Sequence, residues 1–180
     1  MKSSNTALKD VLIFEPESFR DQRGYFYEIY NRSKYPFLEQ GIEFVQDNIS
    51  FSVKNTLRGL HFQKSKPQGK LVTCLQGEVR DVLVDLRISS NTFGEHLIIS
   101  LSQANKKQIW IPPGFAHGFH VISDAALFYY KCTDFYDPSD EYGIIWNDLN
   151  LDINWGVNNP IISEKDSYLP SFSTVVENLI

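Results

Sequence analysis

Four histidines are the candidate acid–base groups of this chain, because imidazole titrates near neutral pH and can accept and return a proton. They stand at His61, His96, His117 and His120. A single histidine is more often structural than catalytic, so each assignment depends on the neighbouring residues. Nothing beside His96 or His120 indicates chemistry. We expect these two to lie at the surface or at the rim of a site.

His61 lies in residues 57–63, a segment that also carries Arg58 and Gln63. One short strand would therefore offer a base, a cation and an amide. Arg58 and His61 are three positions apart, which places them on opposite faces of a regular strand. Gly59 between them could allow a bulge that brings both side chains to one face. The alternative interpretation is an exposed polar strand face.

His117 follows Pro112 and Gly114 with a spacing that resembles the second sequence motif of cupins, where this histidine is often a metal ligand. The first cupin motif has two histidines two positions apart, but here Gln63 stands two positions after His61. A catalytic metal site normally needs three protein ligands. We therefore predict no metal site, and we expect His117 to donate a hydrogen bond or contact a phosphate in a pocket.

Two segments are rich in aromatic side chains. Residues 19–28 mix aromatic rings with charges, and residues 128–136 contain Tyr129, Tyr130 and Tyr136. Such rings usually pack in a core. A tyrosine hydroxyl could also serve as a general acid, and a flat ring could stack on a nucleobase.

The elements that would position these residues are mainly strands. Residues 44–51 alternate, with Gln46, Asn48 and Ser50 on one face and apolar side chains mostly on the other. Residues 70–87 are predicted to form a hairpin that turns at Gly77. Further strands are predicted at 97–101, 108–111, 119–122 and 126–132, and short helices at 35–40 and 174–179. This pattern predicts an all-β sandwich or closed barrel whose lumen could hold one ligand.

Composition narrows the class of protein. A chain of 180 residues with 42% hydrophobic and 22% charged residues suits one globular domain. The net charge of −5 argues against a nucleic-acid polymer as partner. Cys74 and Cys132 lack zinc-ligand spacing and are expected to be reduced core thiols. The sequence shows no signal peptide and no apolar run of membrane-spanning length, so we expect a cytoplasmic protein with no membrane partner.

These segments, taken in order, resemble the dTDP-4-dehydrorhamnose 3,5-epimerase family. The similarity runs from residue 10 to residue 170. Its matching segments are 21–24 with Phe26 and Glu28, 44–48, 57–61, 69–72, 81–82 with 84–87, 111–112 with 114–119, 130–131, 145–148 and 163–166. The resemblance implies an all-β, cupin-like jelly-roll barrel with short peripheral helices, formed by one domain over residues 1–180. It also implies a homodimer without metal or cofactor, acting on dTDP-4-dehydro-6-deoxy-D-glucose, a dTDP-4-keto-6-deoxy sugar.

The resemblance also implies a role for each site residue. His61 takes the place of the proton-abstracting base, Tyr130 that of the opposing acid, Asp166 that of the partner of His61, and Lys70 would face the C4 oxygen. Tyr136 matches the residue that stacks on thymine. The other nucleotide and sugar contacts match Arg23, Glu28, Gln46, Asn48, Arg58, His117, Glu141 and Lys165.

Two alternatives stay open from the sequence. A mono-epimerase, or an epimerase of another nucleotide 4-keto sugar, would use the same histidine and tyrosine. A non-catalytic sugar-binding cupin would be expected to lack the set of His61, Tyr130, Lys70 and Asp166.

Overall fold

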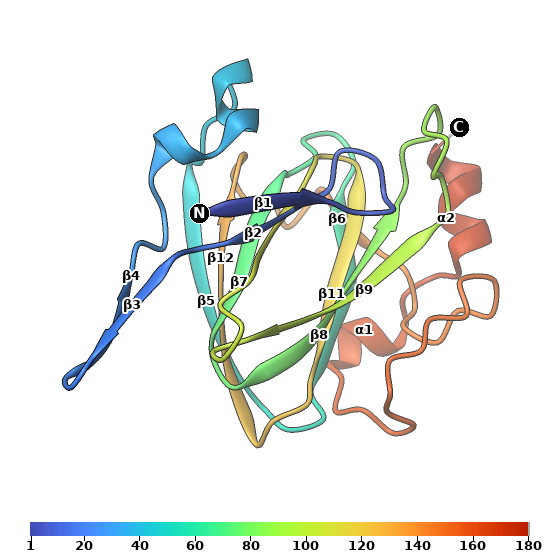
Figure 1. Ribbon diagram of the computed structural model, residues 1–180. Coiled ribbons are helices and arrows are strands. Elements are labelled where there is room, and N and C mark those ends of the chain that lie inside the picture. Colours follow the sequence, from blue (N-terminus) through green and yellow to red (C-terminus); the bar gives the residue numbers. More distant parts are fainter. Residues whose placement is uncertain (180) are drawn as a thin grey trace.

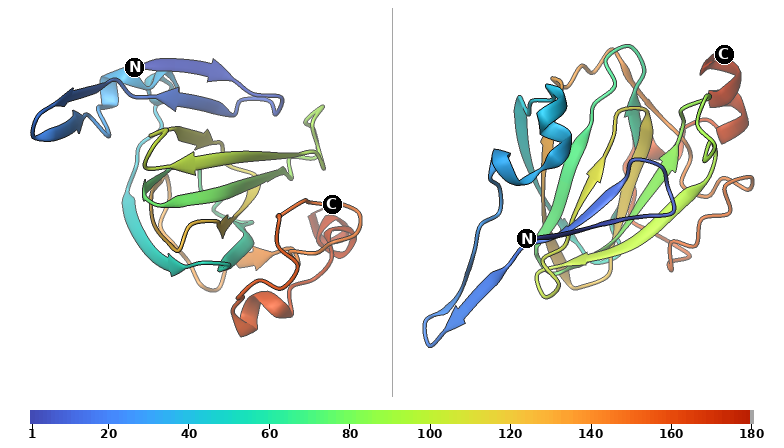
Figure 2. Two further views of the ribbon diagram at one scale, coloured as in Figure 1. Left: turned by 60° about the horizontal axis from the view of Figure 1, so that its bottom comes forward. Right: turned by 45° about the horizontal axis from the view of Figure 1, so that its top comes forward.

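The computed structural model describes residues 1–179, and most of its regular structure is antiparallel β-sheet (Figure 1). One sheet has the strand order β1-β2-β10-β7-β12-β5, and a second has the order β13-β6-β11-β8-β9. The two sheets curve toward each other as a barrel (Figure 2, left). A separate hairpin, β3–β4, projects away from both sheets (Figure 1). The predicted all-β fold is confirmed.

The strands are β1 (Lys2–Asn5), β2 (Leu12–Glu15), β3 (Ser18–Asp21), β4 (Gly24–Tyr27), β5 (Gln46–Val53), β6 (Leu57–Gln63), β7 (Lys70–Gln76), β8 (Glu78–Asp85), β9 (His96–Ser102), β10 (Gln108–Ile111), β11 (Phe115–Val121), β12 (Ala125–Cys132) and β13 (Glu141–Gly143). The helical segments are η1 (Arg32–Lys34), η2 (Pro36–Gln40), α1 (Glu164–Ser167) and α2 (Phe172–Leu179). The two predicted helices therefore correspond to η2 and α2. No helix within residues 1–179 is long and apolar enough to cross a membrane.

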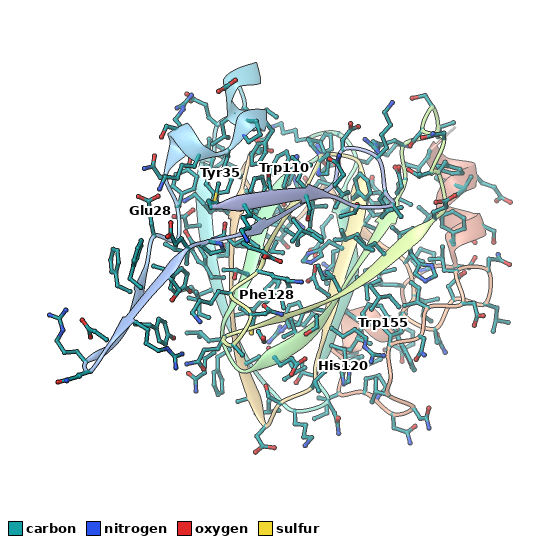
Figure 3. All side chains as sticks on the ribbon, viewed as in Figure 1. Glu28, Tyr35, Trp110, His120, Phe128 and Trp155 are labelled. Carbon is teal, nitrogen blue, oxygen red and sulfur yellow. The ribbon has the colours of Figure 1, made fainter. Side chains whose placement is uncertain are left out.

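An apolar core fills part of the space between the two sheets. It joins Val72 and Phe128 of the first sheet to Leu83 and Phe119 of the second. The rings of Phe119 and Phe128 stack with their centroids 4.4 Å apart, and Phe128 is labelled inside the barrel in Figure 3. Burial of such side chains provides the main favourable free energy of folding. The rest of the lumen is left for polar side chains.

Part of the outer face of each sheet is also covered. The η2 segment covers part of the first sheet, where Phe37 stacks on Trp110 at a centroid distance of 3.9 Å. The C-terminal part of the chain covers the second sheet with Trp155 and Val175. The side chains Trp110 and Trp155 lie in these two separate layers in Figure 3.

The predicted hairpin over residues 70–87 was wrong. β7 pairs with β10 and β12, whereas β8 pairs with β9 and β11, so the two strands belong to different sheets. Gly77 has a φ of 77°, which a glycine adopts without steric cost. The short turn there passes the chain from one sheet to the other instead of folding it back on itself.

The expected surface or rim position of His120 was also wrong. His120 is 4% exposed, and its Nδ1 lies 3.1 Å from the carbonyl oxygen of Trp155. β11 is the middle strand of its sheet, and the C-terminal segment packs over this face. His120 and Trp155 are labelled near each other in Figure 3. His96 is half-buried on the edge strand β9.

β5 carries its polar face inward. The half-buried side chains of this face are Gln46, Asn48 and Ser50. The alternation in the sequence predicted that these three residues share one face. Ile49 and Phe51 on the opposite face are 63% and 61% exposed. This strand therefore presents amides to the lumen and an apolar stripe to the outside.

Candidate active site

A cavity of about 620 Å³ lies between the sheets, and a smaller one of about 280 Å³ adjoins it. We call the two together the lumen cavity, because their walls share His61, Lys70, Tyr130, Tyr136 and Glu141. A cavity of this size, with a few convergent polar groups, is typical of a small-molecule site.

The β6 strand contains the bulge that the sequence predicted. His117 pairs with His61 and Phe119 pairs with Arg58, so β6 has one more residue than β11 across this stretch. Gly59 has a φ of 107°, and a Cβ there would lie 2.6 Å from the carbonyl oxygen of His117. Only a glycine fits at this crossing. As a result, Arg58 and His61 both line the cavity.

His61 is held by Asp166. The imidazole Nε2 lies 2.8 Å from Oδ1 of Asp166, and the backbone N–H of Gly59 donates to Oδ2 at 3.2 Å. Burial raises the pKa of Asp166, but the hydrogen bonds from His61 and Gly59 outweigh it and the pKa is lowered. A charged carboxylate in this position fixes the ring and stabilises its protonated form.

Asp166 is positioned by the start of α1. The Ser163 side chain caps this helix and accepts a hydrogen bond from the Asp166 backbone N–H at 3.1 Å. An isolated bridge between Thr56 and Ile161 fixes the preceding segment beside β6. The two partners of the His–Asp pair are 105 positions apart in the sequence and meet through this bridge.

Tyr130 and Lys70 reach the cavity from the opposite sheet. They lie on β12 and β7, whereas His61 lies on β6 of the second sheet. Burial raises the pKa of the Tyr130 hydroxyl, so the group stays protonated at neutral pH. The preceding Tyr129 does not line the cavity, and its hydroxyl lies 3.4 Å from the Lys131 ammonium. Tyr130 is thus the ring of this doublet that could donate a proton to a bound molecule.

The polar end of the cavity is organised around Glu141. The Tyr136 hydroxyl donates to its Oε2 at 2.6 Å, and the Lys165 ammonium pairs with the same oxygen. The hydrogen bond to Glu141 raises the pKa of Tyr136 to about 12. Oε1 of Glu141 lies 3.9 Å from Nδ1 of His61. This carboxylate therefore lies between His61 on one side and Tyr136 and Lys165 on the other.

The amides of β5 complete this end. Gln46 accepts a hydrogen bond from the Tyr136 backbone N–H at 2.8 Å and donates to Asn48 at 2.9 Å. Both amides line the smaller part of the cavity. They fix the loop that carries Tyr136, whose ring is half-exposed.

His117 lines the larger part and is 8% exposed. Its Nε2 lies 2.8 Å from Oδ1 of Asp81, a carboxylate with no exposed surface. Asp81 was not among the site residues predicted from the sequence. The available signal was a carboxylate directly before the apolar run Val82, Leu83 and Val84, where a buried carboxylate requires a partner.

Arg23 and Glu28 lie outside the lumen cavity. Arg23 follows β3 in the hairpin turn, its side chain is 90% exposed, and it pairs with Asp21 at 2.6 Å. Glu28 pairs with Lys34 at 2.7 Å and is labelled away from the barrel in Figure 3. The structure brings together all the predicted site residues except these two.

Gln63, which stands where the first cupin motif has its second histidine, makes structural hydrogen bonds. Gln63 accepts from the backbone N–H of Asp137 at 2.9 Å and donates to the carbonyl of Lys66 at 2.9 Å. Among residues 1–179, no three His, Cys, Asp or Glu side chains converge as metal ligands would.

A family model described as dTDP-4-dehydrorhamnose 3,5-epimerase matches residues 5–174. This chain belongs to that family. A dTDP-4-dehydrorhamnose 3,5-epimerase from Shigella flexneri is 51% identical over 168 residues, which cover 92% of this chain and 93% of that protein. The similarity to a named 3,5-epimerase thus extends over nearly the full length of both chains.

Solved structures support the same family and the cupin-like fold. The 3,5-epimerase of Legionella pneumophila, described in complex with dTDP-4-keto-L-rhamnose, superposes with a TM-score of 0.94 at 44% identity, covering 99% of this chain and 96% of that one.

A dTDP-4-dehydrorhamnose 3-epimerase from Streptomyces niveus is 34% identical over 92% of this chain and 81% of that protein. The epimerase family thus includes relatives named for one or for two epimerisations.

Proposed function

We propose that this chain is a 3,5-epimerase of dTDP-4-dehydro-6-deoxy-D-glucose that yields dTDP-4-dehydro-L-rhamnose, with one catalytic domain over residues 1–180. The observation that carries the proposal is the arrangement of the His61–Asp166 pair against Tyr130 and Lys70 across one cavity. A base on one wall and an acid on the other suit a reaction that removes a proton from one face and returns it to the opposite face. The 51% identity to a 3,5-epimerase supports the same substrate.

The chemistry follows from the C4 ketone of such a substrate. Hydrogens on C3 and C5 are acidic because the resulting carbanion delocalises onto O4, so the reaction itself requires no electron acceptor. His61 removes the proton through Nδ1, since Nε2 is bound to Asp166. Lys70 stabilises the negative charge on O4, and Tyr130 delivers a proton from the other side. Between cycles His61 releases its proton to solvent and Tyr130 regains one from it, so that two such cycles, at C3 and at C5, invert both centres.

The remaining residues would bind the nucleotide. Arg58, Lys165 and His117 line the larger part of the cavity, and they offer donors for the diphosphate. Tyr136 offers a ring for the thymine, and Gln46, Asn48 and Glu141 offer polar contacts beside it. We place the reaction in the cytoplasm, in keeping with the two free buried thiols, Cys74 and Cys132.

Arg23 and Glu28 can take part only if a second copy of the chain supplies them. The apolar stripe on β5 and the exposed Phe19 and Phe26 of the hairpin, 58% and 69% exposed, offer surface for such a contact. We therefore propose a homodimer in which the β3–β4 hairpin of one subunit reaches the lumen cavity of its partner.

Proton exchange tests the reaction directly. The protein is incubated with dTDP-4-dehydro-6-deoxy-D-glucose in D₂O, and the sugar is followed by NMR. We expect deuterium at C3 and C5 and inversion at both carbons. Exchange at one carbon alone would instead support a mono-epimerase, and the absence of exchange would support a sugar-binding cupin or another substrate.

A further inference from the structure

Gln63 binds the loop that carries Tyr136. It is 5% exposed at the end of β6, where its side chain lines the smaller part of the lumen cavity. Its Oε1 accepts a hydrogen bond from the backbone N–H of Asp137 at 2.9 Å, and its Nε2 donates to the carbonyl oxygen of Phe135 at 3.3 Å. The two residues that flank Tyr136 are therefore bonded to one buried amide.

The same loop is also bound by side chains of the first sheet and its flank. Gln46 of β5 accepts from the backbone N–H of Tyr136 itself at 2.8 Å. Gln68, which lies just before β7, donates to the carbonyl oxygen of Asp134 at 2.8 Å. Loops are ordinarily more mobile than the strands they connect. These bonds, together with those of Gln63, restrict the backbone of residues 134–137 from both sides of the barrel.

The hydroxyl end of Tyr136 is held from the same position on the second sheet. Glu141 of β13 lies directly opposite Gln63 in the pairing of β13 with β6, and side chains opposite each other on neighbouring strands project to the same face. Glu141 accepts from the Tyr136 hydroxyl at 2.6 Å, whereas Gln63 binds the backbone on either side of the ring. Tyr136 is thereby fixed at both ends, although it is 50% exposed.

We propose that Gln63 is a positioning residue for the nucleotide, because it holds the Tyr136 ring in the orientation in which a base can stack on it. This inference rests on the proposed function, in which Tyr136 offers its ring to thymine. A ring that is fixed before the ligand arrives loses little conformational freedom on binding, so more of the stacking energy appears as affinity. The inner face of β6 would then serve both ends of the substrate, since His61, two positions before Gln63, lines the same part of the cavity.

Gln63→Leu tests this role, because leucine is of similar size but cannot form the hydrogen bonds to the loop. The Kd for dTDP, measured by calorimetry, should rise about 5-fold or more, up to the limit of about 150-fold set by a complete loss of stacking. KM for the sugar nucleotide should rise with it. At saturating substrate kcat should stay near the wild-type value, because His61, Tyr130 and Lys70 are unchanged.

The decisive measurement is the coupling between Gln63 and Tyr136. In a Tyr136→Ala background, Gln63→Leu should weaken dTDP binding by less than about 2-fold, because no ring remains to be positioned. An effect of equal size in both backgrounds would mean that Gln63 acts on the cavity independently of this ring, and it overturns the inference. An unchanged dTDP affinity in the single variant Gln63→Leu overturns it as well.

Asp148→Ala is the matched control for a loss of stability. Asp148 is 7% exposed and, like Gln63, binds the backbone of a loop, but it does not line the lumen cavity. It accepts from the N–H groups of Asn150, Leu151 and Phe172 at 2.9, 3.0 and 2.8 Å. This variant should lower Tm and leave the Kd for dTDP unchanged. If it weakens dTDP binding as much as Gln63→Leu does, the inference is rejected.

Gln63→Glu covers the case in which Gln63→Leu fails to fold. The glutamate keeps the side-chain size and an acceptor for Asp137, but once ionised it cannot donate to the carbonyl oxygen of Phe135. Its Kd for dTDP should rise, and this rise should vanish in the Tyr136→Ala background. A rise that persists there rejects the inference.

Turnover of the sugar nucleotide by the wild-type protein is measured in parallel. If Gln63 and Tyr136 are coupled in dTDP binding but the wild-type protein does not epimerise the sugar, the positioning role stands and the proposed function is rejected. If the wild-type protein epimerises the sugar and the coupling is absent, the proposed function stands and the positioning role is rejected. A wild-type protein that does not bind dTDP rejects both.

Discussion

Asp166 binds His61 through Nε2, with 2.8 Å between this nitrogen and Oδ1. Nδ1 is thereby the imidazole nitrogen available to a substrate, and in the resting enzyme it must be the unprotonated one. Asp166 accepts the N–H at Nε2 and so selects this tautomer.

Asp166→Asn tests this selection. An amide N–H beside Nε2 would favour the tautomer with its proton on Nδ1, which cannot accept a proton from carbon. We expect kcat to fall by about 10²- to 10⁴-fold, as for other His–Asp pairs. Calorimetry should show an unchanged Kd for dTDP. A variant that keeps the wild-type kcat would remove Asp166 from the mechanism.

Deuterium exchange distinguishes the residue that removes the proton from the residue that delivers it. His61→Ala should abolish deuterium incorporation at C3 and C5, because no enolate forms. Tyr130→Phe keeps His61 and Lys70, so exchange should persist at one or both carbons while inverted product is nearly absent. Tyr129→Phe is the matched control, since this ring lies outside the cavity, and it should invert both centres normally. Normal inversion by Tyr130→Phe would assign the acid to another group.

Lys70→Ala should lower kcat more than it raises KM. An ammonium on O4 acts mainly when negative charge develops there, and the loss of one such donor typically costs about 10²–10³-fold. Steady-state kinetics with the 4-keto sugar nucleotide measure the changes in kcat and in KM separately. A change confined to KM would place Lys70 on the diphosphate instead.

Tyr136→Ala should weaken nucleotide binding. Stacking of one base on an aromatic ring is worth about 1–3 kcal/mol, which corresponds to a rise of about 5- to 150-fold in the Kd for dTDP. Tyr136→Phe keeps the ring and loses only the bond to Glu141, and Phe135→Ala removes a neighbouring ring that does not line the cavity. Both controls should bind dTDP nearly as the wild type does, as measured by calorimetry.

Mixed subunits test whether Arg23 acts across a dimer. Arg23→Ala should lose about 10-fold or more in kcat/KM, as expected for a charge-assisted contact, and His61→Ala should be inactive. If Arg23 serves the partner's site, co-expressed Arg23→Ala and His61→Ala chains form heterodimers with one intact site. Random pairing then restores about one quarter of the wild-type activity, since half the dimers are mixed and each has one good site. No restoration, or a monomer by light scattering, would reject the arrangement.

The sequence predicted the local features of the site and missed those that depend on tertiary structure. Gly59 between Arg58 and His61 indicated a bulge because a strand of period two separates residues three apart. The alternation in residues 44–51 was likewise correct, and its polar side chains Gln46 and Asn48 line the lumen cavity.

The errors share one physical cause. Gly77 between two apolar strands fits a hairpin turn and a passage between sheets equally well, and the pairing partners β10, β12, β9 and β11 decide between them. His120 is covered by a segment 35 positions away. Asp81 is paired by His117, whose side chain reaches it from the neighbouring strand β11. None of these contacts can be recognised from the residues next to it in the sequence.

The close crossing of β6 and β11 limits how the site can be redesigned. A Cβ on Gly59 would lie 2.7 Å from Cα of Gly118, and a Cβ on Gly118 would lie 2.6 Å from the carbonyl oxygen of Arg58. Each glycine therefore leaves room for the other strand, and neither can be enlarged alone. A mutant library aimed at a different sugar could vary cavity residues outside the proposed catalytic set, but it would have to keep both glycines as a fixed pair.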